Sequence, residues 1–170
     1  MAEAIFRSVL AQRGVDWPIW SVGLLEAGYP MVEEALAALG PDGASMAGHR
    51  SKTPAASDVI AADIVFGMSR EHVREVAVLV PEAWGRTFTL REFVRRSQSF
   101  PPWFPDQPFA NWLAAVHQGR ERQDMQGDSP EDDVADPIGG TPADFAATAR
   151  LLRDLCGKVA DRLSPRLAVT

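Results

Sequence analysis

One apolar run in the middle of the chain, residues 62–68 (ADIVFGM), limits the choice of fold more than any other feature. It has the length of a strand and lacks polar alternation, which is the pattern of a strand covered on both faces. Helix signals lie on both sides of it. Residues 53–62 open with the Thr-Pro pair typical of a helix start, and residues 69–81 run from a capping serine to a proline. A strand between two helices predicts a parallel sheet.

The rest of the chain continues this alternation. Further strands are expected over 17–23 and at the start of 86–93, and further helices over 1–14, 30–40, 109–118 and 141–163. In the last of these, Thr141 and Asp144 resemble a capping box. One apolar face follows at spacings of three and four, formed by Phe145, Ala149, Leu152, Cys156, Val159 and Leu163. We predict an α/β fold in a single domain over residues 1–170, with an irregular, lid-like segment over 95–135.

Charge and cysteine content exclude several classes of function. The chain of 170 residues has a formal net charge of −6, which argues against nucleic acid or an anionic membrane as a partner. No run approaches the length of a membrane span. A single cysteine, Cys156, excludes an internal disulfide and a multi-cysteine metal site. His49, His72 and His117 are widely spaced, so neither zinc nor another cofactor is expected. This composition favours a cytoplasmic protein.

The first helix raises a structural question, because it begins at Met1 with no capping residue before it. Parallel α/β folds bind their ligands where a strand turns into a helix. The strand that would feed this helix is not among the 170 residues.

The opening MAEAIFR and the SVG at 21–23 resemble the first helix and the second strand of the low-molecular-weight protein tyrosine phosphatase family. The likeness follows the family's order along nearly the whole chain. The resemblance continues through GHRSK (48–52), the segment 61–73, FTLREF (88–93) and DDVADPIGG (132–140). FTLREF is most similar to an actinobacterial branch. The resemblance implies a three-layer α/β/α fold whose first, central strand is missing from this chain.

The resemblance also implies a mechanism. In the family, a cysteine thiolate in a C-x-x-x-x-x-R-S loop attacks phosphorus, and the arginine of that loop binds the phosphoryl oxygens. Neither residue is present here ahead of the first helix. Asp136 matches the general acid of the family's Asp-Pro loop. Ile138 and Gly139 stand where the family often has aromatic residues, a departure that weakens the case for phosphotyrosine. The expected substrates are phosphotyrosine proteins or small aryl phosphates.

Three functions remain open at this point. The first is a phosphomonoester hydrolase whose nucleophile precedes Met1, with an internal methionine taken as the start. The second is an inactive, truncated relative acting as a binding or regulatory protein. The third is an arsenate reductase-like enzyme, a chemistry that generally recruits further cysteines.

Other reactive or aromatic residues have structural interpretations. Cys156 lies on the apolar face of the last helix, which predicts a buried thiol. The acidic run 120–133 is expected to be a solvated connector. Packing roles are expected for the tryptophans, which are Trp17, Trp20, Trp84, Trp103 and Trp112.

Overall fold

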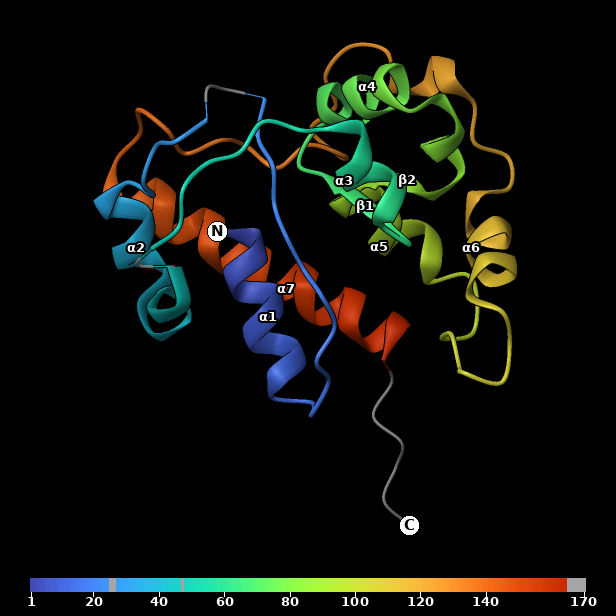
Figure 1. Ribbon diagram of the computed structural model, residues 1–170, viewed down its shortest axis with the longest axis horizontal. Coiled ribbons are helices and arrows are strands. Elements are labelled where there is room, and N and C mark those ends of the chain that lie inside the picture. The colour runs from blue at the N-terminus through green and yellow to red at the C-terminus, as the bar shows by residue number, and fades with distance from the viewer. Residues whose placement is uncertain (25–26, 47, 165–170) are drawn as a thin grey trace. The chain divides into compact units, whose positions relative to one another are not determined.

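The computed structural model describes residues 1–24, 27–46 and 48–164 (Figure 1). Its residue contacts divide the chain into two compact units. Unit 1 comprises Met1–Pro54 and Asp136–Asp161, and unit 2 comprises Ala55–Ala135 with a short piece that begins at Arg162. The expectation of a single domain stays a prediction.

Helices alternate with two short strands along the chain. In order, the elements are α1 (Ala2–Ala11), α2 (Glu33–Leu39), the 3-10 helix η1 (Gly40–Met46), α3 (Ala56–Ala61), β1 (Val65–Gly67), α4 (Arg70–Leu79), the 3-10 helix η2 (Pro81–Arg86), β2 (Thr87–Thr89), α5 (Leu90–Ser97), α6 (Phe109–His117), the 3-10 helix η3 (Arg122–Met125) and α7 (Pro142–Leu163). The predicted α/β class is confirmed. None of the described helices is both long enough and apolar enough to cross a membrane.

The sheet of unit 2 is parallel, as the apolar run predicted. Strands β1 and β2 pair with Phe66 opposite Phe88, and α4 lies between them in the chain. Ser69 caps α4 as expected, because its hydroxyl accepts the backbone N–H of His72 at 3.4 Å. Gly67 ends β1 where space is short, since an added Cβ would lie 2.9 Å from the His72 Cβ atom. The turn from β1 into α4 therefore requires a glycine.

Aromatic rings hold α5 and α6 to the strands of unit 2. Thr89 ends β2 and caps α5 by accepting the N–H of Glu92 at 3.0 Å. The Phe93 ring packs edge-on against Phe88, with 5.5 Å between ring centroids, and against Trp112 of α6 at 6.1 Å. All three rings are buried. This cluster confirms the packing role expected for Trp112.

Helix α7 belongs to unit 1 as far as Asp161, and its apolar face forms the centre of that unit. All six residues predicted on that face are buried, from Phe145 to Leu163. Helix α1 contributes Ala4, Ile5 and Leu10 to the buried residues of this unit. Arg153 of α7 donates from Nη2 to the carbonyls of Ala38 and Leu39, which satisfies acceptors at the end of α2.

Two local predictions are wrong. Residues 17–23 do not form a strand, because a strand needs a hydrogen-bonded neighbour and the ladder found in the described residues joins only β1 to β2. The helix expected over 53–62 is shorter, spanning Ala56–Ala61. Its start is set by Asp58, whose carboxylate accepts the Ala55 N–H at 3.2 Å, rather than by the preceding threonine.

The prediction of a solvated connector over 120–133 is also wrong at both ends. The side chain of Arg120 is only 1% exposed, and its Nε and Nη2 atoms donate to the two carboxylate oxygens of Glu92 at 2.6 and 2.9 Å. The guanidinium lies between the rings of Trp84 and Phe88, 4.2 and 4.1 Å from their centroids. Asp132, at the other end, is 1% exposed and paired with arginines. Burial with a partner therefore replaces solvation at these positions.

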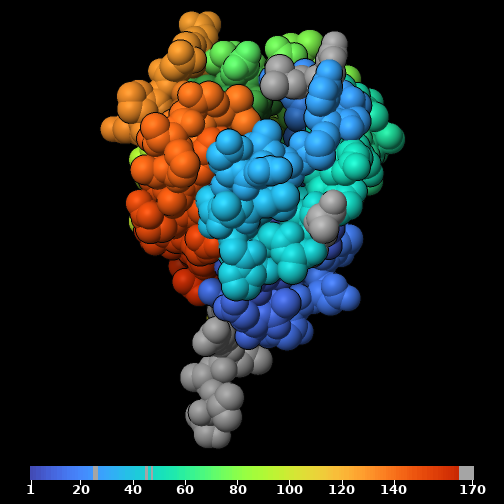
Figure 2. All heavy atoms as spheres, turned by 90° about the vertical axis from the view of Figure 1, so that its left-hand side faces the viewer, coloured from blue at the N-terminus to red at the C-terminus, as the bar shows by residue number. Residues whose placement is uncertain are grey.

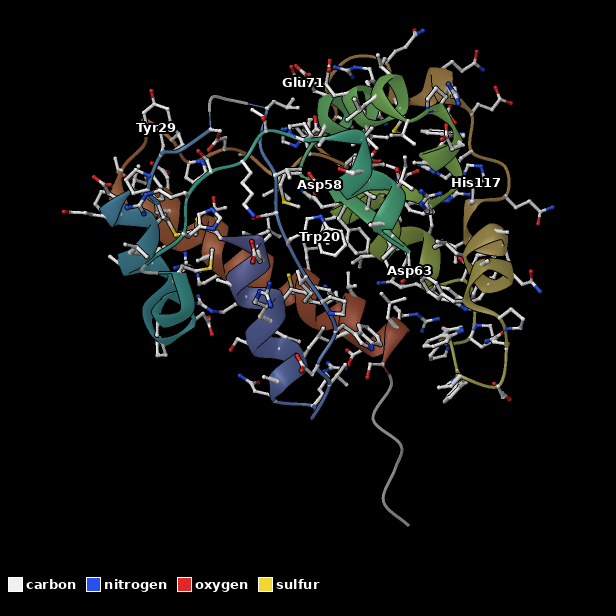
Figure 3. The ribbon with its side chains drawn as sticks, viewed as in Figure 1. Trp20, Tyr29, Asp58, Asp63, Glu71 and His117 are labelled. Atoms are coloured by element: carbon white, nitrogen blue, oxygen red, sulfur yellow. The ribbon has the colours of Figure 1, made fainter. Side chains whose placement is uncertain are left out.

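His117 of α6, labelled in Figure 3, contacts this cluster. Its Nδ1 atom lies 3.0 Å from Arg120 Nη1, and a guanidinium can only donate, so Nδ1 accepts and the ring is neutral. Burial first, then the charges of Arg120 and Arg96, lower the pKa of His117, while Glu92 opposes them.

The lowered pKa of His117 makes the free energy of unfolding dependent on pH. Between the unfolded pKa of about 6.5 and the lower folded value, the unfolded chain binds more protons. The free energy of unfolding is therefore expected to fall as the pH drops below about 6.5, and His117→Gln is expected to flatten that fall. Urea titrations between neutral and mildly acidic pH measure this. An unchanged slope in the variant would contradict it.

Candidate active site

Asp136 lies on the exposed loop of unit 1 that leads into α7. Its Oδ1 atom accepts the backbone N–H of Ile138 at 3.0 Å, a local bond that keeps the carboxylate at a turn. The carboxylate is thus fixed by its own loop and open to solvent. That is a suitable setting for a group that exchanges protons with a bound molecule.

The loop after Asp136 is tight, for two reasons. Gly139 has a φ of +81°, a conformation that favours glycine, and a Cβ on Gly140 would lie 2.9 Å from Asp144 Oδ2. The predicted capping box is present as well. Thr141 donates its N–H and its hydroxyl to Asp144 Oδ2, both at 2.7 Å, and the hydrogen bond from the backbone lowers the pKa of Asp144. The path from Asp136 into α7 is therefore well defined.

The residues just before the loop are anchored within unit 2. Asp132 accepts two hydrogen bonds from Arg70, at 2.9 and 2.8 Å, and one from Arg95 at 2.6 Å. Burial opposes the ionisation of Asp132, but these hydrogen bonds outweigh it and hold its pKa below the usual range. Asp133 Oδ1 accepts the Arg70 N–H at 2.8 Å, and the Val134 N–H donates to the Met68 carbonyl at 2.7 Å. Residues 132–134 are therefore held in place within unit 2.

Helix α1 is tied to residues 17–23 through its first turn. The Ser21 hydroxyl donates to Glu3 Oε2 at 2.6 Å, and Arg7 bridges Glu3 Oε1 at 3.1 Å. Arg7 also donates to the Ile19 carbonyl. Met1 is the N-cap residue, with no side-chain cap, and burial lowers the pKa of its amino group. The start of α1 and the stretch around Ser21 are therefore held together within unit 1.

A shallow groove of about 410 Å³ lies beside the loop of Asp136 in unit 1. Glu33, Glu34, Ala37 and Ala38 of α2 line one side. Figure 2 shows α2 next to the start of α7, whose Pro142 and Ala146 line the other side. The first turn of α2 is thus close to the end of the loop that carries Asp136.

Comparison with known proteins identifies this architecture. The family model for low molecular weight phosphotyrosine protein phosphatase matches residues 1–103, more than half of the chain. The chain belongs to this phosphatase family. No curated protein sequence matches it significantly.

Solved structures of this phosphatase family have a similar fold. A low molecular weight protein tyrosine phosphatase from T. tengcongensis is 27% identical with a TM-score of 0.69, over 95% of this chain and 88% of that one. The tyrosine phosphatase amsI of Erwinia amylovora is 18% identical, with a TM-score of 0.66 over 96% and 83%. The YwlE arginine phosphatase of Geobacillus stearothermophilus is 22% identical, with a TM-score of 0.64 over 94% and 83%. The last two likenesses show the fold alone.

Within this phosphatase domain, Cys156 is unsuited to act as the nucleophile. Its side chain is 3% exposed on the buried face of α7, as the sequence predicted, and burial raises the pKa of its thiol to about 12. A thiol with that pKa is almost entirely protonated at neutral pH. The described residues contain no group of three or more acidic, histidine or cysteine side chains able to hold a metal.

The residues that the sequence had singled out have different local surroundings. Asp136 is exposed on its loop in unit 1, and Cys156 is buried in α7. His72 accepts the Met68 N–H at Nδ1, at 3.1 Å, and so has a structural partner. The anchor of Asp132 was missed, because its two arginines lie 62 and 37 positions away and nothing in an acidic run marks which carboxylate is buried.

Proposed function

We propose that the chain is the main part of a phosphomonoester hydrolase in which Asp136 is the general acid. The family match over residues 1–103 supports the phosphatase function, and the role of Asp136, outside that range, rests on the resemblance of DDVADPIGG (132–140) to the family's Asp-Pro loop. The exposed carboxylate of Asp136, held at a tight turn, adds support. The proposal includes a cytoplasmic location and a phosphoprotein or small aryl phosphate as substrate.

The proposed reaction has two steps. A thiolate attacks phosphorus and forms an S–P bond, while the P–O bond to the leaving group breaks and Asp136 gives that oxygen its proton. The resulting carboxylate then takes a proton from water, whose oxygen attacks phosphorus and releases inorganic phosphate and the thiolate. Because Cys156 is buried and protonated, we assign the thiolate to a loop encoded ahead of Met1.

The test compares two proteins: the 170-residue chain, and the chain extended by the residues encoded in frame ahead of Met1. The extended protein is expected to hydrolyse aryl phosphate, and the 170-residue chain is not. Cys156→Ser is the control and is expected to leave the activity of the extended protein unchanged. A stop codon ahead of Met1, or loss of activity in the control, would refute the proposal.

Assays of the same extended protein with other substrates test the alternative functions. Arsenate with a thiol reductant tests the arsenate reductase alternative, and phosphoarginine tests the activity named for the YwlE structures. We expect aryl phosphate to be preferred over arsenate, because the chain holds no second reactive thiol for a redox relay.

A further inference from the structure

Two neighbouring positive charges of unit 1 have no acidic partner among the residues that the structure describes. Arg50 and Lys52 are both exposed, and neither forms an ion pair with any residue that the structure describes. The guanidinium of Arg50 donates only to the carbonyl of the adjacent residue, His49, at 2.8 Å. Both charges are therefore available to a bound molecule.

Three other arginines of unit 1 are engaged with carboxylates of the same unit, whereas Arg150 is a single exposed cation on α7 with no ion pair to a described residue. Arg7 is paired with Glu3, Arg13 with Asp161 and Arg153 with Asp42. In a chain with a net charge of −6, unpaired cations that lie two residues apart stand out from their surroundings. An acidic ligand repelled by most of the surface would be attracted there.

The backbone around these charges is held in place. The Gly23 N–H donates to the Lys52 carbonyl at 2.8 Å, and the Gly28 N–H donates to the Ser51 carbonyl at 2.9 Å. Ser51 and Tyr29 exchange two bonds: the Ser51 N–H donates to the Tyr29 carbonyl at 2.8 Å, and the Tyr29 N–H donates to Ser51 Oγ at 3.0 Å. The side chains at 50 and 52 thus project from an ordered segment.

This segment lies in the same part of unit 1 as the loop of Asp136. Tyr29, its partner, comes four residues before Glu33, the first residue of α2. Glu33 shares the groove with Pro142, which begins α7 directly after that loop. The Tyr29 side chain itself is exposed (Figure 3). The segment that carries the two cations is thus linked, through Tyr29 and α2, to the groove at the end of the loop of Asp136.

We propose that Arg50 and Lys52 bind acidic side chains on either side of the phosphorylated residue, so that the preferred substrate is an acidic phosphopeptide. This inference rests on the proposed phosphatase function. Exposed complementary charges contribute mainly to selectivity and to the association rate, and salt weakens both.

The test is peptide binding to the ¹⁵N-labelled full chain, followed by NMR at low salt. Three probes are used: a phosphotyrosine peptide with Glu and Asp flanks, the same peptide with Gln and Asn flanks, and the acidic peptide without phosphate. The acidic peptides are expected to shift the amide signals of residues 48–53. The double variant Arg50→Ala/Lys52→Ala is expected to weaken their binding about three- to ten-fold.

Arg150→Ala is the matched control, because Arg150 is an exposed cation on α7. This variant is expected to bind the acidic peptides as tightly as the unmodified chain does. Equal binding of acidic and neutral flanks, shifts confined to other residues, or binding of anionic lipid vesicles in place of peptide would overturn the inference. Binding does not require turnover. A protein that discriminates between the flanks but hydrolyses no phosphate would therefore refute the proposed function alone.

Discussion

Replacing Glu92 with alanine is expected to lower the free energy of unfolding by about 3–5 kcal/mol. Glu92 is the carboxylate partner of Arg120, and the two side chains are 4% and 1% exposed. Removing the carboxylate leaves a guanidinium in a site from which water is excluded. Its contacts with the Trp84 and Phe88 rings, and its bond to the Trp84 carbonyl, compensate for only part of the lost solvation.

Urea unfolding of Glu92→Ala and of two control variants, each compared with the unmodified protein, measures this loss of stability. Asp154→Ala removes an exposed partner of Lys158 and is expected to change stability by less than about 0.5 kcal/mol. The double variant Glu92→Leu/Arg120→Met leaves neither charge buried and is expected to be clearly more stable than Glu92→Ala. A Glu92→Ala protein as stable as Asp154→Ala would show that the buried charge is solvated in another way.

The second large effect concerns catalysis. In the protein that carries the phosphate loop, Asp136→Asn is expected to lower kcat for phenyl phosphate by about 10²–10⁴-fold, because an amide has no proton to give to the departing oxygen. The loss is expected to be smaller for nitrophenyl phosphate, whose leaving group departs without protonation. Steady-state kinetics with both esters, each over a range of pH, measure the two losses.

Asp128→Asn is the matched control for this substitution. Asp128 is an exposed carboxylate of the acidic segment that precedes the loop, and the same chemical change there is expected to leave kcat unaltered. Equal losses for the two esters in Asp136→Asn would contradict proton transfer and would indicate a role in folding or substrate binding.

Predictions from local sequence held where the physical cause is local. The run 62–68 contains β1 because a continuous apolar stretch bounded by helices needs cover on both faces. The cap at Ser69 and the capping box at Thr141 involve bonds across three residues, so their side chains identify them directly. The apolar face of α7 follows from a period of 3.6 residues, and the burial of Cys156 follows from that face.

Predictions failed where the cause lies far along the chain. Residues 17–23 have the composition of a strand, but a ladder requires a neighbour, and composition alone does not provide one. Arg120 was assigned to a solvated connector because its sequence neighbours are polar. Its partners Glu92, Trp84 and Phe88 lie 28 to 36 positions away, and their approach depends on how α5, η2 and β2 pack.

The sequence by itself determined the α/β class, the parallel strand pair, the helix caps, the buried face of α7 and the family resemblance, because each depends on residue types at short, regular spacings. Only the tertiary structure decided which charges are buried in pairs, such as Asp132, and which have no ion-pair partner in the described part of the chain, such as Arg50 and Lys52. The reason is physical. Whether a charge is solvated or paired depends on which groups approach it in space, and those groups come from segments that the folded chain brings together.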